Sequence, residues 1–230
     1  MAMTVGFIVF PGVQPLDLVG PFDVFATLGT VQQHLVWKDL TPVVGSGGLT
    51  LQPTTTFTHC PPLDVLCVPG GSGVEPLLED EQTLAFIRGQ AATAHYVTSV
   101  CTGALLLGAA GLLKGRRATT HWAYHELLGA FGAVPSHERV VMDGALITGG
   151  GVTAGIDFAL TIAAEWLGPE QAQRAQLALE YAPAPPFDAG HPHTAPAAVL
   201  AAQRKAVAPA VVRRAECVAR AAARLTARPM

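Results

Sequence analysis

Short apolar runs of strand length alternate with segments of helical periodicity along most of this chain. The predicted strands are residues 5–10, 31–38, 64–69 and 95–100. Apolar residues recur at helical spacing over residues 17–28, 80–94, 102–113 and 152–167. Strands that alternate with helices predict a parallel sheet with helices on both faces. We therefore expect an α/β protein whose chemistry lies in the crevice at the carboxyl ends of the strands.

Two hairpins and one further helix complete the predicted sheet domain. Residues 41–52 include three glycines and are expected to form a hairpin outside the strand–helix alternation. Asp143-Gly144 joins two short strands, because an Asp-Gly dipeptide favours a tight hairpin turn. The two short strands and the helix are predicted over residues 139–142, 145–148 and 122–131, respectively.

The composition changes after Tyr181. Residues 182–196 are rich in proline and predict a connector, and residues 197–228 are rich in alanine and arginine and predict a helix. We expect one α/β domain over residues 1–190 and a helical extension over residues 191–230 that packs on the same domain.

Length and composition exclude several classes of protein. With 230 residues, half of them apolar and 13% charged, the chain can bury the core of one sizeable domain. A formal net charge of −3 provides no basic surface for nucleic acid. No apolar run approaches the ~18 residues that span a bilayer. The N-terminal run has only strand length and no basic residue precedes it, so a signal peptide is not expected.

The four cysteines form neither a CxxC pair nor a zinc-ribbon spacing. A chain of this length does not need disulfides for stability, so we expect four reduced, mostly buried thiols. The cytoplasm is the expected location, and neither a metal nor another cofactor is expected. Cys60, Cys67 and Cys217 are interpreted as structural residues.

Cys101 lies where the strand 95–100 ends and a helix of small residues begins. Ser99 and Gly103 leave room for a sharp strand-to-helix turn, an arrangement that resembles a nucleophile elbow. A thiol at a helix N-terminus is expected to have a lowered pKa and a larger thiolate fraction. The alternative is a buried structural cysteine, because cysteine is among the residues most often buried.

Asp17 follows the first strand at the start of a helix. It could simply cap that helix, since aspartate is a favoured cap residue. Alternatively, its carboxylate faces the same crevice as Cys101, because both residues follow the carboxyl ends of strands.

Two other groups carry weaker signals. The loop 70–73 (Gly-Gly-Ser-Gly) could form an anion-binding nest of backbone N–H groups or an ordinary turn. His121 and His125 are four residues apart, which on an α-helix would allow a metal pair, but no third ligand has suitable spacing. We interpret both as surface or capping histidines, and His191 and His193 as solvated.

Five segments occur in order and together resemble the ThiJ/PfpI superfamily. They are Asp17-Leu-Val-Gly-Pro21, Cys67-Val-Pro-Gly-Gly71, Ser99-Val-Cys-Thr-Gly103, Ala118-Thr-Thr-His-Trp122 and Thr148-Gly-Gly-Gly-Val-Thr-Ala-Gly-Ile-Asp157. The resemblance covers about residues 4–190 and implies a flavodoxin-like fold of the class I glutamine-amidotransferase type. Superfamily members commonly dimerise, and the apolar fraction here is high, so a homodimer is expected.

Departures from other superfamily members narrow the implied activity. Protease-like and glyoxalase-like relatives usually carry Glu where this chain has Asp17, and the proteases have His where it has Thr102. A closer rival is the amidase-like domain of certain AraC-type regulators, which shares two of the segments. Those regulators continue into a helix-turn-helix domain, and we expect no such DNA-reading part here.

The resemblance implies hydration of an isocyanide to an N-substituted formamide. In this scheme Cys101 attacks the terminal carbon, Asp17 donates and later accepts a proton, and a thioimidate links the two steps. Backbone N–H groups of Gly71 and Thr102, with the Thr102 hydroxyl, are candidates to orient Asp17, the sulfur or the attacking water. Val152 is a candidate wall for the apolar substituent. The alternative is a non-catalytic sensor in which Cys101 is oxidised.

Overall fold

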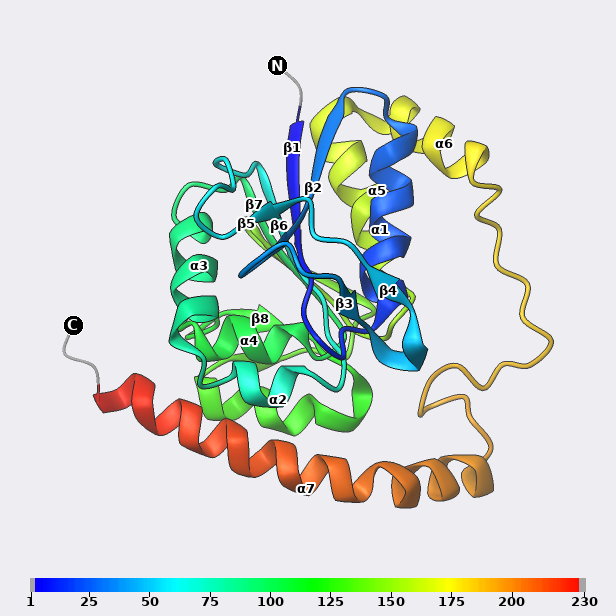
Figure 1. Ribbon diagram of the computed structural model, residues 1–230. Helices are drawn as coiled ribbons and strands as arrows, with labels where there is room; N and C mark the ends of the chain where they lie inside the picture. The colour runs from blue at the N-terminus through cyan, green and yellow to red at the C-terminus, as the bar shows by residue number, and fades with distance from the viewer. Residues whose placement is uncertain (1–2, 228–230) are drawn as a thin grey trace.

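A computed structural model describes residues 3–227 (Figure 1). Residues 1–2 of the predicted α/β domain and residues 228–230 of the predicted helical extension lie outside the described residues. The four predicted runs form the centre of one sheet as β1 (Met3–Ile8), β2 (Val31–Trp37), β6 (Val65–Val68) and β7 (Tyr96–Val100). Nearly every side chain of β1, β6 and β7 is buried, which explains why these runs are continuously apolar.

The sheet has seven strands in the order β10-β11-β7-β6-β1-β2-β5. All neighbours pair in parallel except β10 (Val140–Asp143), which is antiparallel to β11 (Leu146–Gly149) across the predicted Asp143-Gly144 turn. The short strand β5 (Thr55–Thr56) forms the other edge. Because β1 has β2 on one side and β6 on the other, the strand order reverses there, and such a switch point opens a crevice.

Helices cover both faces of the sheet, as Figure 1 shows. One layer contains α1 (Pro15–Thr27), α5 (Ala154–Leu167) and α6 (Pro169–Ala178), which pack on one another. The opposite layer contains α2 (Val74–Leu77), α3 (Glu81–Ala91) and α4 (Gly103–Ala109). The predicted α/β class, with a mostly parallel sheet between two helical layers, is confirmed. Helix α6, which begins with Pro169 at its first turn, was not predicted.

The predicted excursion at residues 41–52 is a two-stranded antiparallel hairpin of β3 (Val43–Val44) and β4 (Thr50–Leu51), with the 3₁₀ turn η1 (Ser46–Gly48) between them. A second small sheet pairs β8 (Arg117–Ala118) with β9 (Val134–Pro135) in parallel. The segment predicted as a helix at residues 122–131 is the 3₁₀ helix η2 (Trp122–Phe131). It ends at Gly132, whose φ of 71° lies in the left-handed region.

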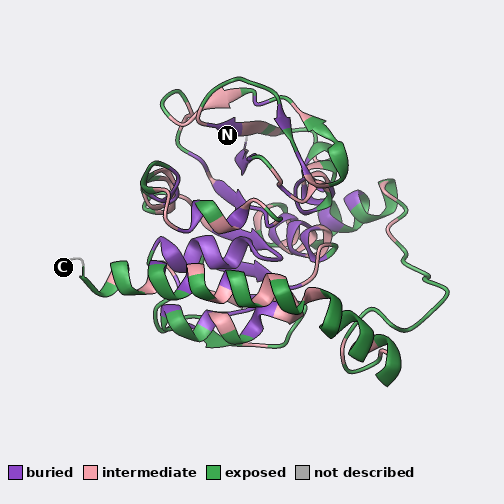
Figure 2. Ribbon diagram, turned by 60° about the horizontal axis from the view of Figure 1, so that its bottom comes forward, coloured by how far each residue is buried: buried purple, intermediate pink, exposed green. Residues whose placement is uncertain are grey.

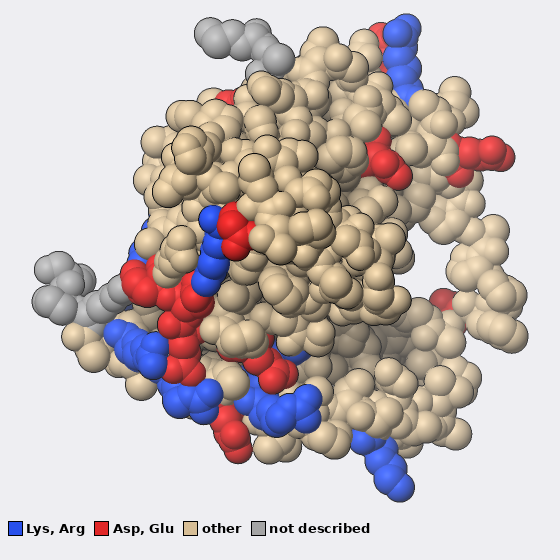
Figure 3. All heavy atoms as spheres, in the orientation of Figure 1, with Lys and Arg blue, Asp and Glu red and all other residues tan. Residues whose placement is uncertain are grey.

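The C-terminal extension is the long helix α7 (Ala197–Ala227), which follows an exposed connector and packs against η2, α4 and α2. Only a narrow stripe of α7 is buried, formed by Arg214, Val218 and Ala221 (Figure 2). Basic and acidic side chains lie side by side along this edge of the molecule (Figure 3). Among residues 3–227, α7 included, no helix is both long and apolar enough to cross a membrane.

Candidate active site

Three strand ends meet at the crevice because β6 lies between β1 and β7 in the sheet. Asp17 is in the first turn of the helix that follows β1, Gly70 and Gly71 follow β6, and Cys101 follows β7 directly. The topology therefore brings together residues from distant parts of the sequence.

Cys101 occupies a strained turn. Its φ is 54°, a left-handed conformation that costs about 1–3 kcal/mol for a residue other than glycine. Both of its backbone groups are held: its N–H donates to the carbonyl oxygen of Gly149 (3.0 Å), and its carbonyl accepts from the Thr120 hydroxyl (2.6 Å). Helix α4 begins two residues later. This strand–turn–helix geometry matches the elbow predicted from the sequence.

Asp17 is fully buried and does not cap its helix, because the N-cap of α1 is Gln14. The capping alternative is therefore wrong. The carboxylate Oδ2 accepts from the backbone N–H of Gly70 (2.8 Å). The other oxygen, Oδ1, is buried with no hydrogen-bond partner among the described residues. One carboxyl oxygen is thus anchored by the chain, and the other is left for a proton or a ligand.

Two glycines allow the three loops to approach one another. A Cβ at Gly70 would lie 2.5 Å from Thr102 Oγ1 and 3.0 Å from Asp17 Oδ2, so these two side chains converge on one point. Gly71 has a φ of 137°, which other residues rarely adopt. Its N–H donates to Thr102 Oγ1 (3.1 Å). The loop 70–73 therefore uses its first two N–H groups on the chain's own side chains, not on a bound anion.

Burial dominates the acid–base behaviour of the pair. It raises the pKa of Asp17 from 3.8 to about 7, against the opposing effect of the Gly70 N–H. Burial, and then the charge of Asp17, raises the pKa of the Cys101 thiol, while hydrogen bonds from Thr102 and the charge of Arg214 act in the opposite direction. The lowered thiol pKa expected from the helix N-terminus is therefore outweighed by desolvation. Because the charge of Asp17 acts on the Cys101 thiol, the titrations of the two groups are coupled.

A cavity of about 340 Å³ opens beside the thiol. Gly71, Thr102 and Val152, three of the residues predicted to surround Cys101, line it together with that residue. The other lining residues are Gln14, Ser72, Glu75, His121, Tyr124, Ala210, Arg213 and Arg214. The sulfur therefore faces a space large enough for a small organic molecule.

Sequence reasoning missed several residues of this site. The Ala118–Trp122 segment carries a signal only through the family resemblance, yet its Thr120 hydroxyl donates to the carbonyl oxygen of Cys101. Its neighbour Thr119 donates its backbone N–H to Thr148 Oγ1 (2.9 Å). Arg214 reaches the cavity from α7, and no local pattern signals this contact.

The histidine pair does not form a metal site. The segment is a 3₁₀ helix with three residues per turn, so positions four apart differ by about 120° in direction. His121 caps η2 and lines the Cys101 cavity, whereas His125 is buried and stacks on His137 with ring centroids 4.2 Å apart. Within residues 3–227 no group of three or more histidine, cysteine, aspartate or glutamate side chains could hold a metal ion.

The other thiols lie outside the cavity. All four cysteines are free, and Cys67 is fully buried in β6, where desolvation raises its pKa to about 12. Cys60 is partly buried, and desolvation raises its pKa to about 11. Cys217, on α7, accepts a hydrogen bond from Arg220 Nη2 (3.2 Å).

Several known proteins are similar to this chain in sequence and fold. An isonitrile hydratase from Pseudomonas putida is 66% identical over 228 residues, which cover 99% of this chain and 100% of that protein. The crystal structure of a ThiJ/PfpI family protein from Pseudomonas syringae superposes with a TM-score of 0.92 at 45% identity, covering 95% of this chain and 91% of that one. A DJ-1 superfamily protein from Salmonella typhimurium has a TM-score of 0.70 at 27% identity, covering 79% and 100%.

The model of the DJ-1/PfpI family matches residues 3–165, the region that contains β1, β6, β7 and the whole of the elbow. The match confirms the resemblance that the five sequence segments indicated. This chain therefore belongs to the DJ-1/PfpI family.

Proposed function

We propose that this protein is a hydro-lyase that adds water to isonitriles (isocyanides) and releases N-substituted formamides. The observation that carries the proposal is the fully buried Asp17 carboxyl group, whose Oδ2 converges on Gly70 together with the hydroxyl of Thr102, the residue next to Cys101. The 66% identity to an isonitrile hydratase over nearly the whole chain supports it independently.

The first step uses the one proton that the pair shares. In the reactive form Cys101 is a thiolate and Asp17 is a neutral acid. The raised pKa of Asp17, about 7, favours the neutral acid, and Thr102 and Arg214 favour the thiolate against the effect of burial. The thiolate attacks the terminal isonitrile carbon, and that carbon takes the proton of Asp17. A carbon–sulfur bond forms, and the product is a thioimidate with an ionised Asp17 beside it.

The second step returns the enzyme to its starting state. Ionised Asp17 takes one proton from a water molecule as the water oxygen bonds to the thioimidate carbon. The other water proton ends on the nitrogen when the tetrahedral intermediate collapses and the carbon–sulfur bond breaks. The formamide leaves, Cys101 is again a thiolate and Asp17 is again an acid.

Neighbouring groups have supporting roles in this scheme. The backbone N–H and hydroxyl of Thr102 act to lower the pKa of the Cys101 thiol and so favour its anionic form. Gly71 fixes the position of that hydroxyl through its N–H. The substituent on nitrogen occupies the cavity beside Val152, whose apolar side chain favours an alkyl or aryl group.

Turnover in heavy water tests the proposal. A simple alkyl isocyanide such as cyclohexyl isocyanide should give the formamide with deuterium on the formyl carbon, because that hydrogen comes from the exchangeable carboxyl proton. Oxygen from labelled water should appear in the carbonyl group. Cys101→Ala should form no product. Formamide production by Cys101→Ala at the wild-type rate would overturn the scheme.

The same experiment separates the proposal from a redox-sensor role. A sensor would form no formamide, yet peroxide would add oxygen mass to Cys101.

A further inference from the structure

Arg214 is the one buried charged residue of α7 within the described part of that helix. Its Nη2 donates to the carbonyl oxygen of Gly71 (3.3 Å) and lies 3.4 Å from Glu75 Oε1. The guanidinium group covers the ring of Tyr124, with 4.4 Å between its central carbon and the ring centroid. Its Nε is buried with no partner among the described residues. A cation is costly to bury, so its neighbours must compensate for its charge.

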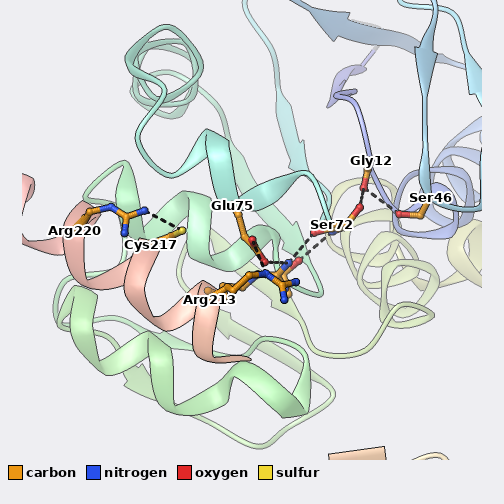
Figure 4. Close-up of polar contacts among 10 residues, drawn as sticks. Gly12, Ser46, Ser72, Glu75, Arg213, Cys217 and Arg220 are labelled. Carbon is orange, nitrogen blue, oxygen red and sulfur yellow. Dashed lines mark hydrogen bonds and ion pairs between the residues drawn. The ribbon is translucent and has the colours of Figure 1, made fainter. Parts of the chain in front are cut away.

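Glu75 does not fully provide that compensation. Its side chain is 21% exposed and also lies 3.8 Å from the guanidinium of Arg213, so one carboxylate faces two arginines. Figure 4 shows Arg213 and Glu75 next to each other, close to Ser72. Arg213, Arg214 and Glu75 therefore carry a formal net charge of +1 between them.

The matching negative charge lies across the same cavity. Whenever Asp17 and Cys101 hold one proton between them, the pair carries one net negative charge, whichever residue has the proton. Cys101 and Arg214 both line the 340 Å³ cavity. Opposite charges attract more strongly in such a partly buried site than in water.

A hydrogen-bond path also connects Arg214 to Thr102. The carbonyl of Gly71 accepts from Arg214, and the N–H of the same residue donates to Thr102 Oγ1. Thr102 is the next residue after Cys101 and acts to lower the pKa of its thiol. Loss of the guanidinium would thus remove a charge and release one end of this path.

We propose that Arg214 is a positioning residue of the hydration site, through which α7 fixes Gly71 and stabilises the anion as its charge moves from Asp17 to the sulfur of Cys101. This role rests on the proposed function, but its electrostatic part can be measured without any isonitrile. Through Arg214, the C-terminal helix α7 is part of the active site.

The pH dependence of Cys101 alkylation by iodoacetamide, measured by mass at the Cys101 peptide, tests this role. The profile follows the thiolate fraction. The other titratable or charged groups that face the pair or Arg214 are Cys67, Glu75, His121, Tyr124 and Arg213. Burial and Arg214 both lower the pKa of His121, so it is neutral where the thiol titrates.

Arg214→Gln should raise the apparent pKa of the alkylation profile by about one unit and slow alkylation at pH 7.5 about tenfold. Arg214→Lys keeps the charge and should recover most of the shift. Glu75→Gln removes the counter-charge and should move the profile in the opposite direction. Arg220→Gln is the matched control, because Arg220 lies on the same helix, is exposed and pairs with Glu79 (2.7 Å) away from the cavity.

If Arg214 only attached α7 to the domain, Arg214→Gln would lower the melting temperature and leave the alkylation profile unchanged. That result, or an unmoved profile in Glu75→Gln where Arg214→Gln fails to fold, would overturn the inference. If the wild-type protein forms no formamide while the Arg214→Gln and Glu75→Gln profiles shift as expected, the proposed function alone is overturned.

Discussion

The carboxyl edge of the sheet and helix α7 both reach the cavity beside Cys101, but different interactions hold them there. At the edge, backbone groups make the decisive contacts: Gly70 binds Asp17, Gly71 binds Thr102, and Gly149 binds the N–H of Cys101. Helix α7 is 31 residues long, and side chains alone attach it, through a buried stripe and ion pairs.

The difference has a physical consequence. Backbone positions at strand ends are set by the whole sheet, so a substitution there changes chemistry while the geometry persists. A helix attached by side chains loses its position in proportion to the contacts removed. We therefore expect large effects on catalysis from edge substitutions and smaller, graded effects on stability from α7 substitutions.

Asp17→Asn should lower the rate of formamide production more than Asp17→Glu, Val218→Ala or Glu79→Gln. The amide is neither an acid nor a base at neutral pH, and its oxygen can still accept from the Gly70 N–H. Loss of general acid–base help typically costs about 10²–10⁴ in rate, and the upper part of this range is expected because Asp17 acts in both steps. Steady-state formamide production measures the loss.

Asp17→Glu is the matched variant for that experiment. It keeps the carboxyl group but displaces it by roughly an ångström, which can cost about 10²-fold in rate. Wild-type turnover in Asp17→Asn would end the proposed role of this residue, even if Cys101 remained essential.

The same Asp17→Asn substitution should stabilise the protein at high pH. The raised pKa means that the folded state holds a proton that the unfolded chain has released, so wild-type stability falls as pH rises from 3.8 to about 7. Removing the group should raise the free energy of unfolding by about 2–4 kcal/mol at pH 8. The gain should vanish below pH 4, where the unfolded chain is protonated too.

Denaturant unfolding at pH 8 and pH 4 measures this difference. A wild type as stable as Asp17→Asn at both pH values would contradict the raised pKa of the buried carboxyl. Together, the two Asp17 experiments test whether the edge gives up stability to hold a reactive group.

Much of the edge could be predicted from the sequence because its signals are local. A continuous apolar run followed by a cysteine and small residues predicts a buried strand, a turn and a helix, and the structure places Cys101 there. The partners of Asp17 could not be predicted, because a residue that caps the helix and a residue that faces the crevice both occur at the start of a helix and look alike in the sequence. The sheet order, which no single segment encodes, decides between them.

The contacts of α7 could not be predicted for a different reason. Alanine and arginine predict a helix but do not say which face is buried. Arg214 is 143 residues from Gly71, and nothing in its neighbours distinguishes it from the exposed Arg213. The sequence also predicts a lowered pKa for Cys101 whereas burial raises it, because a helix N-terminus can be inferred from the sequence and the degree of burial cannot.

Val218→Ala should reduce stability without changing the chemistry. Val218 is 1% exposed in the buried stripe of α7, and the change removes two methyl groups. We expect a loss of about 1–2 kcal/mol in the free energy of unfolding. Denaturant unfolding measures it, and kcat for formamide production should stay within about twofold of wild type while the helix remains docked. A loss of kcat larger than that of Asp17→Asn would contradict the distinction between the two regions.

Glu79→Gln should have the smallest effect. The Glu79 carboxylate pairs with Arg220 Nε (2.7 Å) and Arg224 Nη2 (2.6 Å), and both arginine side chains are more than half exposed. The hydrogen bond from Arg220 is the main cause that lowers the pKa of Glu79. A lowered pKa means that the pairing stabilises the fold above the usual glutamate pKa and that this contribution is lost as pH falls through the folded value.

Melting temperatures of wild type and Glu79→Gln should therefore differ slightly at neutral pH and low salt. They should converge in acid and in high salt, because exposed ion pairs are weak and salt screens them. The difference should also be smaller than that caused by Val218→Ala. A salt-independent destabilisation as large as that of Val218→Ala would mean that ion pairs, more than the buried stripe, hold α7 in place. The ion pair of Arg214 would then be one of several that attach the helix, and Arg214 would not be the residue that joins α7 to the active site.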